Sequence, residues 1–373
     1  FFFDPFQHLF PVHHKYLFIS DIYIPLYLFV ISLKADTHYT KLPSPCYHTI
    51  RKQHRIKNRR RLSMRDVLEQ AVALGKTHTH EGAVATYIPE LGKVDGSQLG
   101  VSVFCRNGKR ISVGDTKVRF SIQSISKIIT LAVALEICGF DQVFKKVGME
   151  PTGDPFNSLM KLENTDSSPY NPMINAGAIV VASCLASEIS FDTMLDTIRA
   201  LCMDPDINLD KKVYHSEMSH ISRNRAIAYL LESKGYIEKN KDVENSLHFY
   251  VKMCSLSVTA ESLAGLGLIL ANDGIHPDTG KRLLSSQAVK IVKTLMFTCG
   301  MYDGSGEFAV RVGIPSKSGV GGGILSVVDG EMGIGIFGPA LDKKGNSVAG
   351  ECVLEYMSHE LHLHMFDPQR HTL

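Results

Sequence analysis

Strand-like patterns occur near both ends of the chain and are separated by a long helical stretch. The first group is LGVSVFC (99–105) and KRISVG (109–114), and the second is FAVRVGIP (308–315), GGILSVV (322–328) and EMGIGIFG (331–338). Asn107-Gly108 and Asp329-Gly330 each separate two such runs, and both pairs are typical of tight hairpin turns. We therefore predict that strands from both ends of the chain meet in one antiparallel sheet.

The residues between the two strand groups carry apolar side chains at helical spacing over most of 140–270. The expected fold is α/β (α+β), an antiparallel sheet flanked by helices plus a helical subdomain. Its sheet-containing part would span about 64–139 and 271–373, and its helical subdomain about 140–270. A site in the groove between the two parts is typical of such a layout.

Residues 1–63 differ from the remainder, because an aromatic-rich run is followed by the basic run RKQHRIKNRRR (51–61). Asp21 and Pro25 interrupt the apolar part, which falls short of the roughly 20 residues of a membrane span. Its charge follows the apolar region, whereas a signal peptide has charge before it. We expect an atypical leader outside the native fold, with Met64 as the natural start. A genuine targeting or anchor leader is the alternative.

The composition is that of a globular protein, with 44% hydrophobic and 21% charged residues. A formal net charge of +2 gives no indication of a nucleic-acid partner. The eight cysteines are scattered without a C-x-x-C pair, which favours reduced thiols and a cytoplasmic location. His359-Glu360-Leu361-His362 misses the H-E-x-x-H spacing by one residue, so we predict no catalytic metal.

Ser124 and Lys127 form an S-x-x-K pair where a buried helix is predicted to begin. Side chains three residues apart lie on one helix face, and the helix dipole at the first turn would favour an alkoxide at Ser124. Burial would ease Lys127 toward the neutral base that a nucleophilic serine requires. The alternative is an ordinary polar pair on a helix.

Lys317-Ser318-Gly319 stands between two strand-like runs and resembles the K-T/S-G element that accompanies S-x-x-K in serine β-lactamases and penicillin-binding proteins. The glycines at 319 and 321–323 allow a backbone to approach a ligand closely. A backbone N–H after Gly319 would be placed to help form an oxyanion hole. A flexible glycine-rich connection between strands explains the same residues.

Two further segments carry polar residues at predicted helix ends. Asn171 and Asn175 flank a turn that leads into a helix of small residues, and Glu217 and Asn224 flank a stretch that we predict to be irregular. Amides at a helix mouth can hold a carboxylate or carboxamide, and a carboxylate suits a substrate ammonium. Capping of the helices explains both segments equally well.

In combination, these segments resemble one family, the glutaminases with the serine β-lactamase/penicillin-binding-protein-like fold, in their compact bacterial type. The matching phrases are GAVATYIPEL (82–91), GDTKVRFSIQSISK (114–127), VGMEPTGDPFNS (147–158), NPMINAGAI (171–179), Glu217 followed by Asn224, CGMYDGSGEFA (299–309) and KSGVGGGI (317–324). They occur in the order of the family and cover essentially all of 64–373.

The resemblance implies hydrolysis of L-glutamine to L-glutamate and ammonia through an acyl-enzyme, without a cofactor, by a homodimer or homotetramer. It implies that Ser124 is the nucleophile, that Lys127 is its base, and that Tyr302 or Lys127 relays a proton to ammonia. Implied substrate-binding residues are Tyr87, Ser124, Asn175, Glu217, Asn224, Tyr250, Tyr302 and Val320. The N–H groups of Ser124 and Val320 would form the oxyanion hole. The alternatives are a β-lactamase or penicillin-binding-like hydrolase, against which the absence of S-D-N stands, and a non-catalytic protein on the same fold.

Overall fold

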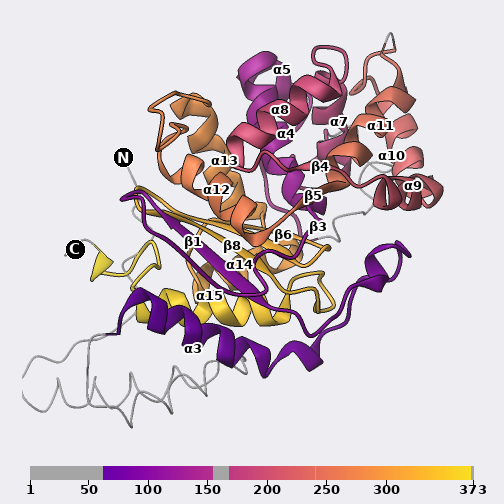
Figure 1. The fold of residues 1–373 in the computed structure, drawn as a ribbon. Helices are drawn as coiled ribbons and strands as arrows, with labels where there is room; N and C mark the ends of the chain where they lie inside the picture. Colours follow the sequence, from indigo (N-terminus) through magenta and orange to yellow (C-terminus); the bar gives the residue numbers. More distant parts are fainter. Residues whose placement is uncertain (1–61, 154–167, 240, 371–373) are drawn as a thin grey trace, which may run out of the picture. The chain divides into compact units, whose positions relative to one another are not determined.

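Strands from both ends of the chain form one five-stranded antiparallel sheet in the order β2-β1-β8-β7-β6 (Figure 1). Its strands are β1 (Gly100–Cys105), β2 (Arg110–Gly114), β6 (Ser316–Gly319), β7 (Gly323–Val328) and β8 (Met332–Phe337). The N-terminal hairpin joins the C-terminal strands where β1 pairs with β8, with Val103 opposite Ile334. The predicted sheet is thus confirmed, and so are the turns at Gly108 and Gly330, whose φ angles are 84° and 75°.

The computed structural model describes residues 62–153, 168–239 and 241–370, which belong to the unit Asn58–Leu373. The leader predicted at 1–63 therefore lies outside the described residues, apart from its last two positions. Ser63 begins the described fold by capping helix α3 (Met64–Lys76): its hydroxyl accepts the N–H of Asp66, and the Asp66 carboxylate accepts the N–H of Ser63.

Helices cover both faces of the sheet, with α3 and α15 (Val348–Glu360) on one side and α12 (Ala260–Ala271) on the other (Figure 1). Helix α12 lies directly on β8 because glycine alternates with isoleucine in that strand. A Cβ atom at Gly335 would lie 1.9 Å from the carbonyl oxygen of Ala260, and one at Gly333 would lie 2.1 Å from the nitrogen of Leu268. The missing side chains allow the helix backbone to contact the strand backbone.

We expect Gly335→Ala to destabilise the protein by about 3 kcal/mol, because the new methyl group would overlap the α12 backbone. Urea unfolding followed by far-UV circular dichroism measures this loss. The matched control is Gly306→Ala, since a Cβ atom there meets nothing within 4 Å and the residue lies in helix α14 (Ser305–Arg311). An equal loss of stability in both variants would contradict close packing of α12 on β8.

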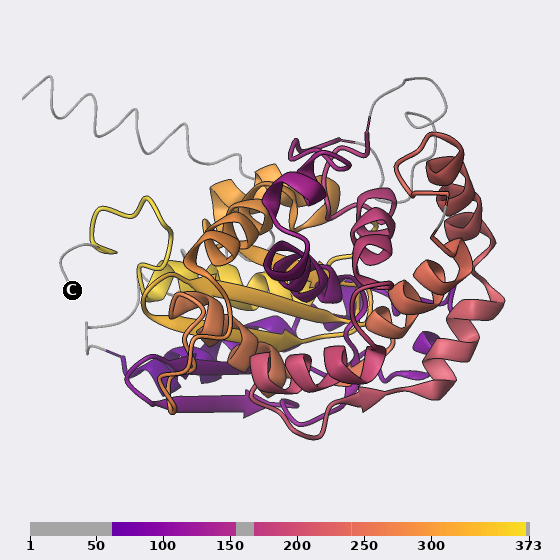
Figure 2. The ribbon, with the colours of Figure 1, turned by 90° about the horizontal axis from the view of Figure 1, so that it is seen from above.

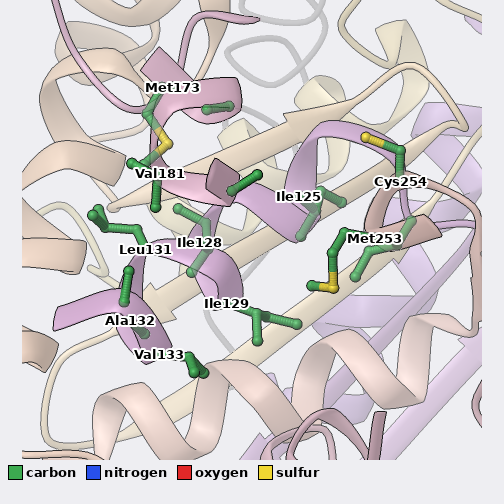
Figure 3. Packing of buried hydrophobic residues seen from close by; sticks show 14 of the residues in the cluster. Ile125, Ile128, Ile129, Leu131, Ala132, Val133, Met173, Val181, Met253 and Cys254 are labelled. Carbon is green, nitrogen blue, oxygen red and sulfur yellow. The ribbon is translucent and has the colours of Figure 1, made fainter. Parts of the chain in front are cut away.

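The remaining helices form one group with α4 (Ser126–Ile137), whose residues from Ser126 to Leu135 are all buried. A helix that is apolar on every side requires neighbours all round, and α4 packs against α7, α11 and α13. Figure 3 shows the side chains of Ile125, Ile128, Ile129, Met173, Val181 and Met253 in this core. The other helices of this group are α5 (Phe140–Phe144), α7 (Asn175–Leu185), α8 (Phe191–Leu201), α9 (Lys211–Ser219), α10 (Ser222–Ser233), α11 (Val243–Cys254) and α13 (Ser286–Cys299). Both views place α9, α10 and α11 together beside the five-stranded sheet (Figures 1 and 2).

Two predictions of local structure are wrong. FAVRVGIP (308–315) was predicted as a strand, but its first part lies in α14, because Phe308 and Val312 are buried at helical spacing while Val310 is 67% exposed. The stretch between Glu217 and Asn224 was predicted as irregular, yet only His220 and Ile221 lie outside helices, and Glu217 lies in α9. Asp210 starts that helix by accepting the N–H groups of the residues at 212 and 213.

Candidate active site

A second, three-stranded antiparallel sheet holds the chain as it enters the Ser124 turn. It consists of β3 (Phe120–Ser121), β5 (Leu256–Val258) and β4 (Asn208–Leu209), in the order β3-β5-β4. The N–H of Ile122 continues this pairing by donating to the carbonyl of Leu256 at 2.8 Å. Ser124 follows in the 3-10 turn η4 (Gln123–Ile125), immediately before α4.

Gln123 has a φ of 50°, in the left-handed region that residues other than glycine seldom adopt. Such strain persists only where surrounding contacts fix the backbone, and it gathers at functional sites. The side chain supplies those contacts: its amide donates to Ser121 Oγ at 2.8 Å and to Glu217 Oε1 at 2.5 Å. The residue before Ser124 thus connects the turn to a carboxylate on α9.

Lys127 is 2% exposed and lies one helical turn beyond Ser124 in α4. Its ammonium nitrogen donates to the carbonyl oxygen of Met173 at 3.1 Å and to Asn175 Oδ1 at 2.8 Å. Burial lowers the pKa of Lys127 to about 8, against a smaller upward influence of nearby Cys254 and Glu217. A substantial fraction of this amine is therefore neutral near pH 8, as a general base requires.

Asn175 and Asn224 meet across the start of helices α7 and α10. Asn175 Nδ2 donates to Asn224 Oδ1 at 3.1 Å, while its oxygen accepts the bond from Lys127. Asn171 has a different task, since its oxygen accepts the N–H of Met173 at 2.9 Å and fixes the turn before α7. Of the two asparagines in this segment, the structure therefore brings only Asn175 to Lys127.

Glu217 is 8% exposed, and its carboxylate faces the amide of Gln123. Burial raises the pKa of Glu217 to about 7, although the hydrogen bond from Gln123 and the charge of Lys127 oppose the rise. Protonation of a group with such a pKa removes its charge as the pH falls through about 7. A ligand ammonium beside Glu217 would favour the ionised form.

Tyr302 enters the site from the turn η5 (Tyr302–Gly304), where its φ is 54°, again in the left-handed region. Burial raises the pKa of the Tyr302 phenol, and the nearby Ser124 side chain and Val320 backbone partly offset this rise. Tyr302 is consequently protonated near neutral pH. Its hydroxyl lies near Ser124, the expected nucleophile, and near the Val320 backbone, an expected donor to the oxyanion.

Tyr87 and Tyr250 complete the set of residues predicted from the sequence. The ring of Tyr87 is 58% exposed, but burial of its hydroxyl end, followed by nearby Tyr302 and Glu217, raises its pKa. Tyr250 in α11 is buried, and its hydroxyl contacts the Cys254 thiol. A cavity of about 590 Å³ opens beside Tyr87 and Val320. Neither Ser124 nor Lys127 lines this cavity, so the two tyrosines are connected to the Ser124 turn only through their neighbours Tyr302, Glu217 and Cys254.

Two residues of the site were not predicted from the sequence to act there. Gln123 adjoins Ser124, but no local pattern reveals its bond to Glu217, which lies 94 positions away. Cys254 lies in the apolar core near Met253 (Figure 3), like an ordinary core thiol. It also lies beside Tyr250 and accepts a long contact from Ser126 Oγ at 3.9 Å. Burial raises the pKa of Cys254 to about 12, so the thiol stays protonated.

Neither a metal-binding group nor a membrane-spanning helix occurs among the described residues. No group of three or more His, Cys, Asp or Glu side chains in 62–153, 168–239 and 241–370 could hold a metal ion. No helix within these same ranges is long and apolar enough to cross a membrane.

The antiparallel sheet between helical layers, with serine and lysine at the head of a buried helix, defines the serine β-lactamase-like class of folds. Within that class the chain belongs to the glutaminase family, which it matches over residues 82–366. The predicted fold and family are both confirmed.

Relatives and solved structures similar to the chain agree with this assignment. A glutaminase of Fusobacterium nucleatum subsp. nucleatum is 50% identical over 307 residues, which are 81% of this chain and 100% of the relative. The structure of the probable glutaminase ybaS is 40% identical with a TM-score of 0.76, covering 82% of this chain and 99% of that one. A covalent complex between the Bacillus subtilis glutaminase YbgJ and 5-oxo-L-norleucine, formed from 6-diazo-5-oxo-L-norleucine, is 38% identical with a TM-score of 0.73. It covers 80% of this chain and 98% of that one.

Proposed function

We propose that the protein hydrolyses L-glutamine to L-glutamate and ammonia through an acyl-enzyme on Ser124. One observation carries the proposal: the Gln123 side chain joins the Ser124 turn directly to the buried carboxylate of Glu217. A serine able to attack an amide and an anion able to hold an ammonium are thereby fixed in one site. Glutamine carries both groups, an amide at one end and an α-ammonium at the other. The glutaminase relatives and the covalent YbgJ complex support the same activity.

In the acylation step, Ser124 Oγ bonds to the side-chain carbonyl carbon of glutamine, and Lys127 Nζ takes the serine proton. The N–H groups of Ser124 and Val320 hold the resulting oxyanion. The C–N bond then breaks, and the leaving nitrogen receives a proton from Lys127, directly or through Tyr302, and departs as ammonia. Water next attacks the γ-glutamyl ester, Lys127 accepts its proton, and Ser124 regains a proton as glutamate leaves.

Recognition of the amino-acid end falls to the other side of the site. Glu217 pairs with the α-ammonium, while the amides of Asn175 and Asn224 and the hydroxyls of Tyr87 and Tyr250 grip the α-carboxylate. A carboxylate with a pKa of about 7 would become fully ionised when the ammonium arrives. This division explains why the groups that select glutamine differ from those that act on its amide.

The activity is tested by measuring ammonia release from L-glutamine with a coupled glutamate dehydrogenase assay. Hydrolysis of a chromogenic cephalosporin is measured in parallel, because the fold also serves β-lactam chemistry. Glutamine-dependent ammonia release without cephalosporin hydrolysis is the expected result. Cephalosporin hydrolysis alone would overturn the proposal.

We expect Glu217→Gln to raise KM for glutamine by about 100-fold, or about 2.7 kcal/mol, because the ammonium would lose its charged partner. Steady-state kinetics measure the change, with the exposed Glu69→Gln as the matched control. 5-Amino-5-oxopentanoate, which lacks the α-amino group, serves as a second control and should be processed equally by both variants. An unchanged KM for glutamine would remove Glu217 from the ammonium site.

The assembly and the location of the protein are also part of this proposal. We expect a homodimer or homotetramer in the cytoplasm, as the family resemblance implies. Sedimentation velocity of the purified full chain measures the assembly, and a sedimentation coefficient that fits a monomer at micromolar concentration would contradict it.

A further inference from the structure

Lys317 carries the only charged group of the K-S-G element (317–319). The proposed reaction does not use this group. Lys317 lies in β6 with no exposed surface, and it is one of the largest fully buried side chains in the described part of the chain. Its amino group donates to the carbonyl oxygens of Gly300 at 3.0 Å and Ser318 at 2.6 Å. The same nitrogen lies 4.3 Å from the centre of the Tyr302 ring.

These contacts join the segment at Gly300 to strand β6, and the backbones of the two segments also contact each other directly. A Cβ atom at Gly300 would lie 1.8 Å from the Ser316 carbonyl oxygen, and the N–H of Ser318 donates to the Gly300 carbonyl at 3.2 Å. The Gly300 segment leads into the strained turn of Tyr302, and β6 leads into Val320. Lys317 therefore stands where the supports of Tyr302 and Val320 meet.

The amine is chemically suited to hold these segments without carrying charge. Burial lowers the pKa of Lys317 well below its usual range, and the positive charge of Lys127 adds to this effect. A neutral amine has two N–H bonds, which match the carbonyls of Gly300 and Ser318. Its position over the ring face of Tyr302 then limits how that ring can tilt.

We propose that Lys317 is a positioning residue, which holds the Tyr302 hydroxyl against Ser124 and the N–H of Val320. The assignment of a task to Tyr302 rests on the proposed function, but the hold on the ring does not. If this side chain served packing alone, methionine would give a more stable fold, because burial of an amine has a cost in free energy that an apolar side chain avoids. Removal of the amine should therefore impair catalysis more than stability.

The test compares wild type, Lys317→Met, Tyr302→Phe and the double variant, with the exposed Lys109→Met as the matched control. We expect Lys317→Met to lower kcat by about 10- to 100-fold with KM for glutamine close to that of wild type, because small misplacements of catalytic groups have effects of this size. In the Tyr302→Phe background, the same substitution should change kcat little, since Lys317 acts through the hydroxyl. An unchanged kcat in the single variant, or full multiplication of the two effects, would overturn the proposal.

A readout independent of turnover separates this inference from the proposed function. The chain has 13 tyrosines and no tryptophan, so its near-UV circular dichroism reports tyrosines. The difference spectrum between each protein and its Tyr302→Phe partner isolates Tyr302. We expect this difference to lose most of its intensity in the Lys317→Met background. An undiminished difference overturns the positioning role, even if the wild type proves inactive on glutamine. If Lys317→Met does not fold, Lys317→Gln, which retains one amide donor group, replaces it with the same expected direction in both readouts.

Discussion

Ser124→Ala is expected to lower kcat for glutamine hydrolysis by about 10⁴-fold or more, because no other group in the site can form the acyl-enzyme. The fold should survive the change, since the serine side chain is small and its described contact is with the Tyr302 hydroxyl. Ammonia release measures the activity, and thermal unfolding shows that the variant remains folded.

The matched control is Ser126→Ala, which removes a hydroxyl from a residue that is also buried and lies two positions further along the chain. Its activity should remain close to wild type. Treatment with 6-diazo-5-oxo-L-norleucine, followed by intact mass spectrometry, should show covalent addition to wild type and Ser126→Ala but none to Ser124→Ala. Turnover by Ser124→Ala near the wild-type rate would exclude the covalent mechanism.

The sheet could be predicted because its signals are local and its pairing follows from them. Asn107-Gly108 and Asp329-Gly330 define hairpins through backbone geometry alone, and alternating apolar residues define the strands between them. The strand predicted for FAVRVGIP (308–315) was wrong because its local pattern is ambiguous. Alternation over a few residues also fits one helical turn, and only the burial of Phe308 and Val312 decides between them.

The short strands β3, β4 and β5 were not predicted, although they fix the entrance to the Ser124 turn. Each has only two or three residues, too few for a periodic pattern, and their pairing joins segments far apart in the chain. The spacing of Ser124 and Lys127 in the sequence could predict that a serine and a lysine lie close together. It could not show that Gln123 adopts a left-handed backbone or that the carbonyl of Met173 receives the amine of Lys127.

Burial links the charge states of Lys127 and Glu217. Both side chains are buried. The charge of Glu217 raises the pKa of Lys127, and the charge of Lys127 lowers the pKa of Glu217, so each favours the ionised form of the other. An ammonium bound to Glu217 would keep that carboxylate ionised but offset its negative charge, and it would thereby weaken the stabilisation of the charged form of Lys127. Glutamine binding should therefore favour the neutral amine that the reaction needs.

Lys127→Met is expected to lower kcat by about 10³-fold, because it removes the base while keeping a side chain of similar length in the buried position. For wild type, the active form has a neutral amine, so kcat/KM should rise as the pH increases through about 8. Below about pH 7, protonation of Glu217 should steepen the loss. Initial rates of ammonia release between pH 5.5 and 9.5, in steps of about half a unit, measure the profile.

Lys127→Arg distinguishes a base from a fixed positive charge. Arginine keeps the charge and the donors for Met173 and Asn175, but it stays protonated across this pH range. If Lys127 serves as the base, both variants are slow and neither shows the rise near pH 8, while the weaker dependence on Glu217 remains. Substantial activity in Lys127→Arg would instead show that the charge of Lys127, acting on the oxyanion or the substrate, is what the reaction uses. The neutral amine would then have no part in activating Ser124.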